Sequence, residues 1–575
     1  MRALLEAGCD RRTFLFGIGK LAAAATASNA FTTSLPAAQI VQDGSGIDPL
    51  LAHFADRYIQ EMRAPGMTLG LVHPDGHTTA AGFGLSDLAR KLPLNPDMLF
   101  QIGSISKSFC AIALLQMRDE GKLDLHQPVL EPLPWLPIET PYGEITIHHL
   151  LTHSSGLPDN PPLFLSDRNA RHRQGFKPGT QFHYSNLGFE ILGHLAATLD
   201  GGTYAHVLQT RILDPLGMTA TRPAISNEMR ASEAQSYVLY RDDLLNARDA
   251  RLAEAPRAFF DSAAGCVAST ASDMARYMRM LLNRGQGPTH RIVSEESLTL
   301  FATPHIEAEE FGIGAHYGYG IAIDSLDGRK LLKHTGGMQS FTSSMQIDLD
   351  GGAAAFASVN TNEGYRPNPV TTYALRLMRA RAQRQPIPAP EPIEDPKMVL
   401  HAEEYAGAYK GDAGEVHVTA QDESLFVTIG VARIRLQRVA GDSFVAEDEA
   451  WQDFLWTFLR AETNNQANPS PVTELMYGSR WYVNSSYKGS VSISAPKRFA
   501  PFEGTYDSGN DFLRVVLCKG TLFAGDTPQI EIGDGLFRAS DEPNSPETLE
   551  FMHVVNGRAR IVLVSGVPHR RIEMD

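Results

Sequence analysis

Cysteine is scarce in this 575-residue sequence, which contains four in all. Cys9 lies near the N-terminus, and Cys110, Cys266 and Cys518 are an odd number set far apart. No disulfide framework of the kind that holds small secreted domains together can therefore be inferred. We interpret each of the last three as a small buried hydrophobic residue.

Long apolar runs and an excess of positive charge are also missing. Beyond the first thirty residues, no run approaches the ~18 apolar residues that a membrane span needs. Lysine plus arginine total 51 against 66 acidic residues, and the net charge is −15. This balance gives no support to nucleic-acid binding, which usually needs a basic face, or to binding at an anionic membrane surface.

Several catalytic and binding motifs do not occur. The sequence has no Gly-x-Ser-x-Gly, no His-Glu-x-x-His, no paired Cys-x-x-Cys and no Walker loop. The first absence disfavours the serine triad of α/β-hydrolases, and the others give no reason to expect a metal or a nucleotide. We predict neither a metal nor a cofactor.

The first thirty residues have the pattern of an export signal. Arg11 and Arg12 precede Phe14, Leu15 and a mildly apolar, alanine-rich run that ends in small residues. This pattern is typical of a twin-arginine signal over residues 1–30, and a frayed amphipathic N-terminus is the alternative. We expect the mature protein to be periplasmic or secreted.

Composition divides the remaining chain into segments. Residues 46–382 mix helix-like and strand-like sequence, and the proline-rich residues 383–396 are interpreted as a linker. Beyond the linker the sequence alternates and is rich in turns, as in "GEVHVTA" and "FLRVVLCKG". Alternation favours antiparallel β-structure, in which successive side chains face opposite sides.

The C-terminal segment also repeats itself weakly. "YAGAY" at Tyr405 and "FEGTY" at Phe502 are 97 residues apart (502 minus 405), and Leu425 and Leu522 recur at the same offset. We predict two similar antiparallel β-barrel-like domains, at 397–498 and 499–575, and an accidental repeat is the alternative.

A serine and a lysine stand three residues apart before a helix-like run. "FQIGSISKSF" contains Ser104 and Lys107 and precedes the apolar run "CAIALLQM". Positions i and i+3 share one helical face, about 5–6 Å apart at Cβ, so the lysine can reach the serine hydroxyl. A serine needs a base to take its proton, and a buried lysine whose pKa falls from about 10.4 toward neutrality can do so. The pair is a minimal activated nucleophile.

The same spacing also occurs at Ser485 and Lys488 in "WYVNSSYKGS". That stretch is β-patterned and no helix follows it, so the spacing would not place the two side chains on one helical face. We interpret it as a strand and a turn, and the motif alone is weak support for catalysis.

Two further motifs accompany Ser104 in the same segment. They are Tyr184 and Asn186 in "GTQFHYSNLGFEILG" and the triplet His334, Thr335 and Gly336 in "LLKHTGGMQSFTSSM". This order resembles the penicillin-recognising serine hydrolases, in the branch with class C β-lactamases, D-alanyl-D-alanine carboxypeptidases, D-aminopeptidases and related esterases. The resemblance covers residues 46–382 and includes "ITIHHLLTHSSGLPD", "DPLGMTATR", "STASDMARYM" and "YGYGIAI".

The resemblance implies an α+β fold, with an antiparallel sheet flanked by helices beside an all-helical subdomain and Ser104 at their junction. It also implies roles for the motif residues. Ser104 would be the acylated nucleophile, Lys107 its base and Tyr184 a proton shuttle. Asn186 would bind the substrate amide, and the backbone N–H groups of Ser104 and Gly337 would form the oxyanion hole.

One position departs from the β-lactamases, which usually have lysine where His334 stands. His334, Thr335 and Gly336 are expected to bind substrate, but a histidine is only partly charged near neutral pH and anchors a carboxylate weakly. A Tyr184 phenolate near neutral pH would need stabilising cations, which Lys107 and His334 could supply. His153 is expected to order a loop, with a third triad member as the alternative, and His183 is expected to be structural or to lie at the rim of the site.

The departure at His334 favours the D-aminopeptidases and esterases, and D-aminopeptidases also resemble this chain in carrying two β-domains. We predict an exported serine hydrolase that cleaves an amide or ester through an acyl-enzyme on Ser104, D-aminopeptidase-like or specific for D-amino acids. An esterase or β-lactamase of the same family is one alternative, and a β-lactam or cell-wall sensor without turnover is another. The expected partner is a small-molecule or short-peptide substrate, and the oligomeric state is left open.

Overall fold

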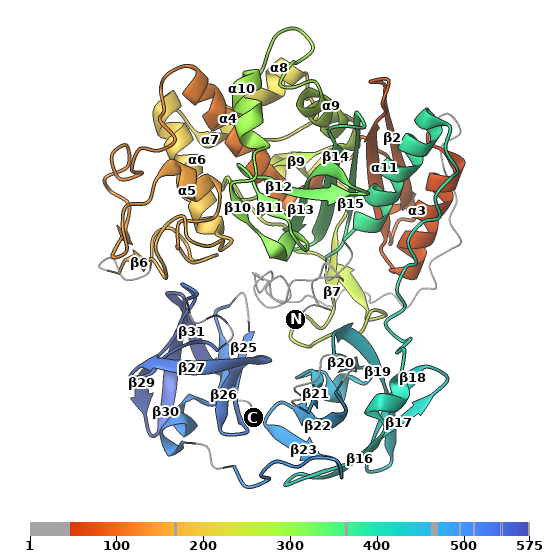
Figure 1. The fold of residues 1–575 in the computed structure, drawn as a ribbon, viewed down its shortest axis with the longest axis vertical. Helices are drawn as coiled ribbons and strands as arrows, with labels where there is room; N and C mark the ends of the chain where they lie inside the picture. Colours follow the sequence, from red (N-terminus) through yellow and green to blue (C-terminus); the bar gives the residue numbers. More distant parts are fainter. Residues whose placement is uncertain are drawn as a thin grey trace.

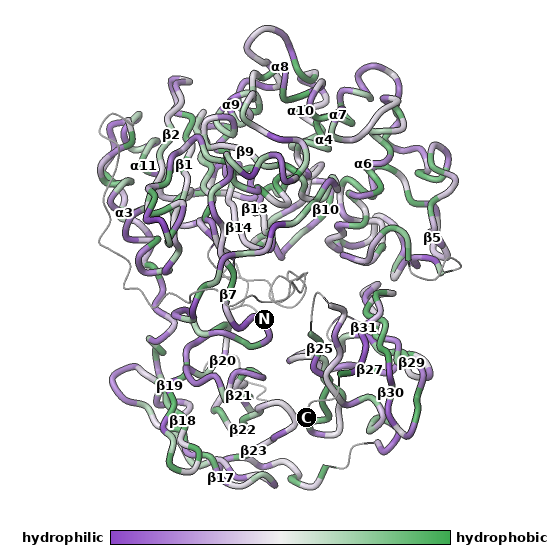
Figure 2. The backbone as a smooth tube through the Cα atoms, turned by 180° about the vertical axis from the view of Figure 1, so that it is seen from behind, coloured by the Kyte–Doolittle hydropathy of each residue, from purple (hydrophilic) through white to green (hydrophobic). Residues whose placement is uncertain are grey.

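The computed structural model describes residues 46–165, 170–362, 366–461, 470–493, 496–509, 512–540, 542 and 544–572. The predicted export signal, residues 1–30, lies outside the described residues. An α+β part, from α3 to α11, lies above two closed β-barrels that stand side by side, as Figures 1 and 2 show from opposite sides. In the described ranges, no helix is long and apolar enough to cross a membrane.

A nine-stranded antiparallel sheet forms the centre of the α+β part. Its strands, in spatial order, are β10 (Ile306–Glu307), β11 (His316–Tyr317), β12 (Ala322–Leu326), β13 (Arg329–Met338), β14 (Phe341–Asp348), β15 (Ala353–Val359), β1 (Gly66–Val72), β2 (Thr78–Asp87) and β3 (Leu92–Pro93). Alternate residues of a strand face opposite sides. In β15, Ala355 packs with helices α3 (Pro49–Glu61) and α11 (Asn368–Gln383), whereas Phe356 packs with α9 (Ala271–Leu282).

The helices on the α9 side of the sheet form an all-helical region. They are α4 (Ser106–Asp119), α5 (Ile147–Leu151), α6 (Asn186–Asp200), α7 (Tyr204–Leu208), α8 (Asp214–Leu216) and α10 (Glu295–Phe301). Every residue of α4 from Ser106 to Met117 is buried, because this helix lies between the sheet and the other helices. The predicted sheet, flanking helices and helical subdomain are thereby confirmed.

Three short strand pairs complete the α+β part. They are β4 (Phe100–Gln101) with β9 (Ala268–Ser269), β5 (Ile138–Glu139) with β6 (His172–Arg173), and β7 (Tyr237–Leu239) with β8 (Leu252–Glu254). Cys110, Cys266 and Cys518 are free and buried, as their interpretation as hydrophobic residues requires. The domain boundaries themselves, including the linker at 383–396, remain predictions.

Two barrels of eight strands each follow. The first barrel consists of β16 (Gly407–Gly411), β17 (Gly414–Gln421), β18 (Ser424–Ile429), β19 (Ala432–Ala440), β20 (Ser443–Ala446), β21 (Trp456–Arg460), β22 (Val472–Tyr477) and β23 (Arg480–Val483). The second barrel consists of β24 (Gly504–Asp507), β25 (Phe512–Cys518), β26 (Thr521–Ala524), β27 (Thr527–Gly533), β28 (Leu536–Ala539), β29 (Leu549–Val555), β30 (Arg558–Val564) and β31 (Val567–Ile572).

The repeat at an offset of 97 residues is confirmed by the strand register. Tyr409 pairs with Val416 in the first barrel, and Tyr506 pairs with Leu513 in the second (506 minus 409 and 513 minus 416 are both 97). Each tyrosine hydroxyl donates to the carbonyl oxygen four residues earlier, at 2.9 Å in the first barrel and 2.7 Å in the second. Ser485, from the second Ser-x-x-Lys pair, lies in a turn just after β23.

Candidate active site

Ser104 lies in a single 3₁₀ turn, Gly103–Ile105, that leads directly into α4. Strand β13 packs against this turn so closely that a Cβ on Gly336 would lie 1.8 Å from the Ile102 carbonyl oxygen. Gly103 has a φ of +54°, and a Cβ on it would lie 2.7 Å from the Gly337 amide nitrogen. The glycines therefore allow the two backbones to meet at Ser104, with the Gly337 amide nitrogen close to the turn.

Lys107 is fully buried one helical turn after Ser104. Its Nζ lies 3.0 Å from Ser104 Oγ and donates to Asn186 Oδ1 at 2.6 Å and to the Ala264 carbonyl at 2.8 Å. Burial lowers the pKa of Lys107 to about 7, although the negative charge of Asp159 acts in the opposite direction. Near neutral pH a substantial fraction of Lys107 is therefore a free amine that can accept the Ser104 proton.

Tyr184 completes the contact around the nucleophile. Lys107 Nζ lies 4.8 Å from the centre of its ring. Burial raises the pKa of Tyr184 far above its usual value, the nearby Ser104 side chain opposes this, and the charges of Asp159 and Glu310 add to it. The site therefore favours the neutral phenol over a phenolate near neutral pH.

Asn186 is the first residue of α6, and the side chain of Ser185 caps this helix. The Asn186 Oδ1 faces Lys107, whereas its Nδ2 and backbone N–H both donate to Asp159 Oδ1, at 2.9 and 3.1 Å. Burial and the nearby Glu547 carboxylate raise the pKa of Asp159 to about 6. Asn186 thus connects Lys107 to the buried carboxyl group of Asp159. Sequence reasoning assigned Asp159 no role, although it ends the family-like stretch "THSSGLPD".

His334 is buried on β13 and both of its ring nitrogens have partners. Nε2 accepts from the Tyr317 hydroxyl at 2.9 Å, and Nδ1 donates to the Thr335 carbonyl at 2.6 Å. Burial, together with the positive charge of Lys107, lowers the pKa of His334 to about 3. A neutral imidazole does not stabilise a Tyr184 phenolate, so His334 does not supply the cation that the sequence allowed for.

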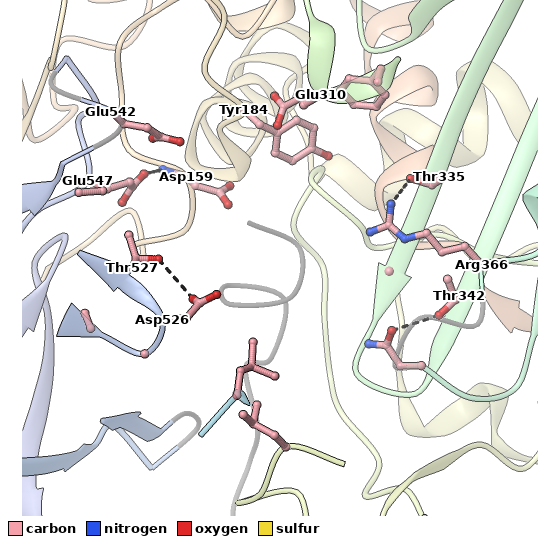
Figure 3. Close-up of a pocket in the computed structure, with 18 of the residues that line it drawn as sticks. Asp159, Tyr184, Glu310, Thr335, Thr342, Arg366, Asp526, Thr527, Glu542 and Glu547 are labelled. Carbon is pink, nitrogen blue, oxygen red and sulfur yellow. Dashed lines mark hydrogen bonds between the residues drawn. The ribbon is translucent and has the colours of Figure 1, made fainter. Parts of the chain in front are cut away.

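A different cation approaches this strand. Arg366 Nη1 donates to Thr335 Oγ1 at 3.3 Å, and the Arg366 carbonyl accepts from the Tyr58 hydroxyl at 2.6 Å. Figure 3 shows the guanidinium group extending toward Thr335 on one side of the cavity. Sequence reasoning missed Arg366, which lies outside every motif.

The two histidines expected to be structural lie behind Tyr184. His153 packs its ring 4.2 Å from the ring of Tyr184, and its Nδ1 accepts from the Ser185 N–H at 2.9 Å. His183 Nε2 lies 3.0 Å from a carboxylate oxygen of Glu547, which belongs to the second barrel. Both histidines therefore hold the segment that carries Tyr184.

A cavity of about 1340 Å³ connects these groups and is lined by the α+β part and by both barrels. Of the predicted site residues, Ser104, Tyr184, Asn186, His334, Thr335 and Gly337 line it. Arg514 of β25 joins its walls, because its Nη2 donates to the Asp243 carbonyl at 2.8 Å and to Asp453 of the first barrel at 2.9 Å. Within the described ranges, no group of three or more His, Cys, Asp or Glu side chains is placed to hold a metal ion.

Comparison with known proteins identifies the family. The Beta-lactamase family model matches residues 52–380, which contain all of the motif residues described above. The chain belongs to the Beta-lactamase family. It is therefore a serine hydrolase, as its sequence predicts.

Individual relatives are distant. The chain is 26% identical to penicillin-binding protein 4* of Bacillus subtilis, over 62% of this chain and 81% of that protein. It is 28% identical to a beta-lactamase of Escherichia coli, over 38% of this chain and 57% of that protein. The octameric penicillin-binding protein homologue of Pyrococcus abyssi aligns with a TM-score of 0.54 and 24% identity, covering 76% of this chain and 99% of that one, which shows a common fold.

Proposed function

We propose that this serine hydrolase cleaves amide or ester bonds through a covalent acyl-enzyme on Ser104, with Lys107 as the base. The observation that carries the proposal is the position of Lys107, whose Nζ lies fully buried and 3.0 Å from Ser104 Oγ. Hydrogen bonding distance and a pKa close to neutrality are the two properties that a general base needs.

In the acylation step, Ser104 Oγ forms a bond to the substrate carbonyl carbon while its proton passes to the neutral amine of Lys107. The negative charge that develops on the carbonyl oxygen is stabilised by the backbone N–H groups of Ser104 and Gly337. The nearness of the Gly337 amide nitrogen to the Gly103 turn supports this role.

Collapse of the tetrahedral intermediate breaks the bond to the leaving group, which needs a proton. The neutral phenol of Tyr184 donates it and regains a proton directly from the Lys107 ammonium, whose Nζ lies 4.8 Å from the centre of the tyrosine ring. A water molecule then attacks the ester on Ser104, and the same groups return the hydroxyl proton to the serine. Atoms and protons balance without any further reactant.

For the substrate, we propose an N-terminal D-amino acid amide or peptide, as in D-aminopeptidases. His334 is neutral and offers no cation to a substrate carboxylate. The negative charges of Asp159 and Glu310 lie near enough to Tyr184 to raise its pKa, so this end of the site attracts an ammonium group. Periplasmic or secreted location through residues 1–30 is part of the same proposal.

One observation favours a second candidate, a β-lactamase or another hydrolase of carboxylate-bearing substrates. Arg366 approaches Thr335 on β13, beside the position where the β-lactamases usually carry a lysine. A guanidinium group binds carboxylates in a bidentate manner. This candidate predicts that substrates with a carboxylate near the scissile bond are preferred over those with a free amino group.

A burst experiment tests the proposed chemistry. Mixing the full chain with p-nitrophenyl acetate should release a burst of one p-nitrophenol per active site, and Ser104→Ala should abolish the burst. A burst that persists in Ser104→Ala contradicts the mechanism. A panel of D-amino acid amides, matching L-amides, short-chain esters and nitrocefin then separates the two candidates and, if none is turned over after acylation, favours the sensor.

A further inference from the structure

The second barrel inserts an acidic side chain into the α+β part. Glu547 precedes β29, and its Oε1 accepts from the Asp159 N–H at 2.6 Å and lies 3.0 Å from His183 Nε2. The His183 side chain is 3% exposed and the Glu547 side chain 21% exposed, so the contact is largely shielded from water. Figure 3 shows Glu547 and Asp159 next to each other at the edge of the cavity.

Glu547 is oriented before it reaches across the interface. Its second carboxylate oxygen accepts from the Ser565 hydroxyl, which lies in the turn between β30 and β31. The Thr548 N–H donates to the same hydroxyl at 3.3 Å, and the Ser565 N–H donates to the Thr548 carbonyl at 2.8 Å. Both carboxylate oxygens therefore have partners, one inside the barrel and one outside it.

The group that Glu547 holds is connected to the catalytic base. Both backbone groups of Asp159 are hydrogen-bonded. Its N–H donates to Glu547, and its carbonyl accepts from the Leu187 N–H at 2.9 Å. Asp159 Oδ1 accepts both N–H groups of Asn186, and this leaves Asn186 Oδ1 directed at Lys107. Two hydrogen-bonded residues thus separate the barrel carboxylate from the lysine amine.

Glu547 also acts on the segment that carries the phenol. His183 directly precedes Tyr184, and its backbone N–H donates to the His153 carbonyl at 2.8 Å while its ring meets Glu547. One carboxylate therefore fixes two loops, at Asp159 and at His183, that together place the amide and the phenol around Ser104.

We infer that Glu547 is a positioning residue of the active site, through which the second barrel holds Asp159 and His183 so that Asn186, Lys107 and Tyr184 stand correctly around Ser104. The inference rests on the proposed function, because it concerns the rate at which Ser104 is acylated. It makes the second barrel a required part of the catalytic centre rather than a cover over the cavity. Small displacements of reacting groups are costly to rate, which is why a distant contact can matter.

The test is burst kinetics of the full chain with p-nitrophenyl acetate. Glu547→Ala leaves the Asp159 N–H and the His183 ring without their acceptor, and we expect its acylation rate constant to fall about tenfold or more. The burst amplitude should stay at one per chain, because Ser104 itself is intact. Glu547→Gln keeps a neutral acceptor for both donors and should fall only about threefold, since uncharged hydrogen bonds are about half as strong.

The matched control is Glu550→Ala, which removes the same charge from an exposed position three residues later on β29 and should acylate at the wild-type rate. A wild-type rate in Glu547→Ala overturns the inference. So does a lower amplitude with an unchanged rate, which would mean that Glu547 contributes to stability alone. Should Glu547→Ala fail to fold, the Glu547→Gln rate decides: a threefold drop supports the inference and no drop overturns it. A wild-type chain without a Ser104-dependent burst would instead refute the proposed function.

Discussion

Burial of the Lys107 amine is central to the chemistry that we propose at Ser104. Lys107 has hydrogen-bond acceptors on three sides, yet burial still lowers its pKa to about 7. The same burial acts in the other direction on Tyr184, whose pKa rises because the phenolate is the charged form. The structure therefore pairs a neutral base with a neutral acid, and neither group has to be stabilised by a second cation.

The pKa of Lys107 predicts how acylation depends on pH. Only the unprotonated amine accepts a proton, so the rate should be constant above about pH 8 and fall as the pH drops through 7. Well below that pKa the decrease should be about tenfold per pH unit, as for a single protonation. Stopped-flow measurement of the p-nitrophenyl acetate burst between pH 5 and 9 checks this.

The control for this pH dependence is the melting temperature in the same buffers, which separates protonation of the base from acid unfolding. An acylation rate that stays flat between pH 8 and pH 6, in a chain that remains folded, would exclude Lys107 as the base.

At the residue scale, sequence reasoning found what is written in contiguous motifs. Ser104 and Lys107 share a helix start, and Tyr184 and Asn186 share another, so short spacings were enough to propose them. Glu547 and Asp159 are 388 residues apart, and a single acid in a loop has no spacing that marks it. The charge states of Tyr184 and His334 were missed for a related reason, because they depend on burial that only the fold reveals.

At the scale of elements, β13 and the Ser104 turn pack so closely that no side chain fits between their backbones at Gly336. A Cβ added to Gly336 would lie 1.8 Å from the Ile102 carbonyl oxygen and 3.2 Å from the Ser104 amide nitrogen. Backbone atoms on both sides leave no flexible group that could yield. The sequence identifies this glycine by motif, whereas the reason for it is visible only once the strand and the turn are in contact.

Gly336→Ala should therefore separate β13 from the Ser104 turn and disturb the oxyanion hole. Loss of one oxyanion donor costs about 10²–10³ in rate, and we expect the burst rate to fall by at least the lower figure. Gly188→Ala is the control, since this buried glycine of α6 would place its Cβ at ordinary distances of 3.5–3.6 Å from its neighbours. Equal acylation rates in the two variants would show that the close approach has no catalytic role.

The barrels show what alternation and repetition can and cannot predict. The alternating sequence "GEVHVTA" lies in β17. The pairing of β16 with β17 recurs, 97 residues later, as the pairing of β24 with β25. Local patterns specify strands because one face of each strand is buried in the barrel. Local patterns do not specify where a folded barrel packs against the rest of the molecule, because that contact is made by turns and single side chains, which have no repeating pattern.

The whole molecule encloses its active site from three directions. Figure 1 shows the second barrel beneath the helical region that includes α5 and α6, and the first barrel beneath the sheet. Together they line one cavity with Ser104 at its wall. Arg514 of the second barrel reaches Asp453 of the first, so the two barrels also support each other. The role that we infer for Glu547 makes catalysis depend on docking as well as on the fold of any one part.

A substitution at Gly175 would test whether catalysis depends on the docking of the second barrel. A Cβ at this position would lie 2.6 Å from the Pro546 backbone nitrogen and 3.0 Å from the Asn544 carbonyl oxygen, so the loop before Glu547 rests directly on the glycine. A branched side chain cannot fit there unless the second barrel moves away. Gly175→Val should therefore withdraw Glu547 from Asp159 and lower the acylation rate about tenfold, as far as Glu547→Ala does.

Gly202→Val is the matched control for Gly175→Val. Gly202 is exposed in the same part of the chain, and the nearest atoms to its Cβ belong to the flexible His206 side chain at 3.4 Å or more, so the substitution disturbs no interface. Combining Gly175→Val with Glu547→Ala should slow acylation no further than either change alone, because both remove the same contact. Additive losses would mean that Gly175 acts on the site by another route, and a wild-type rate in Gly175→Val would mean that catalysis tolerates a displaced barrel.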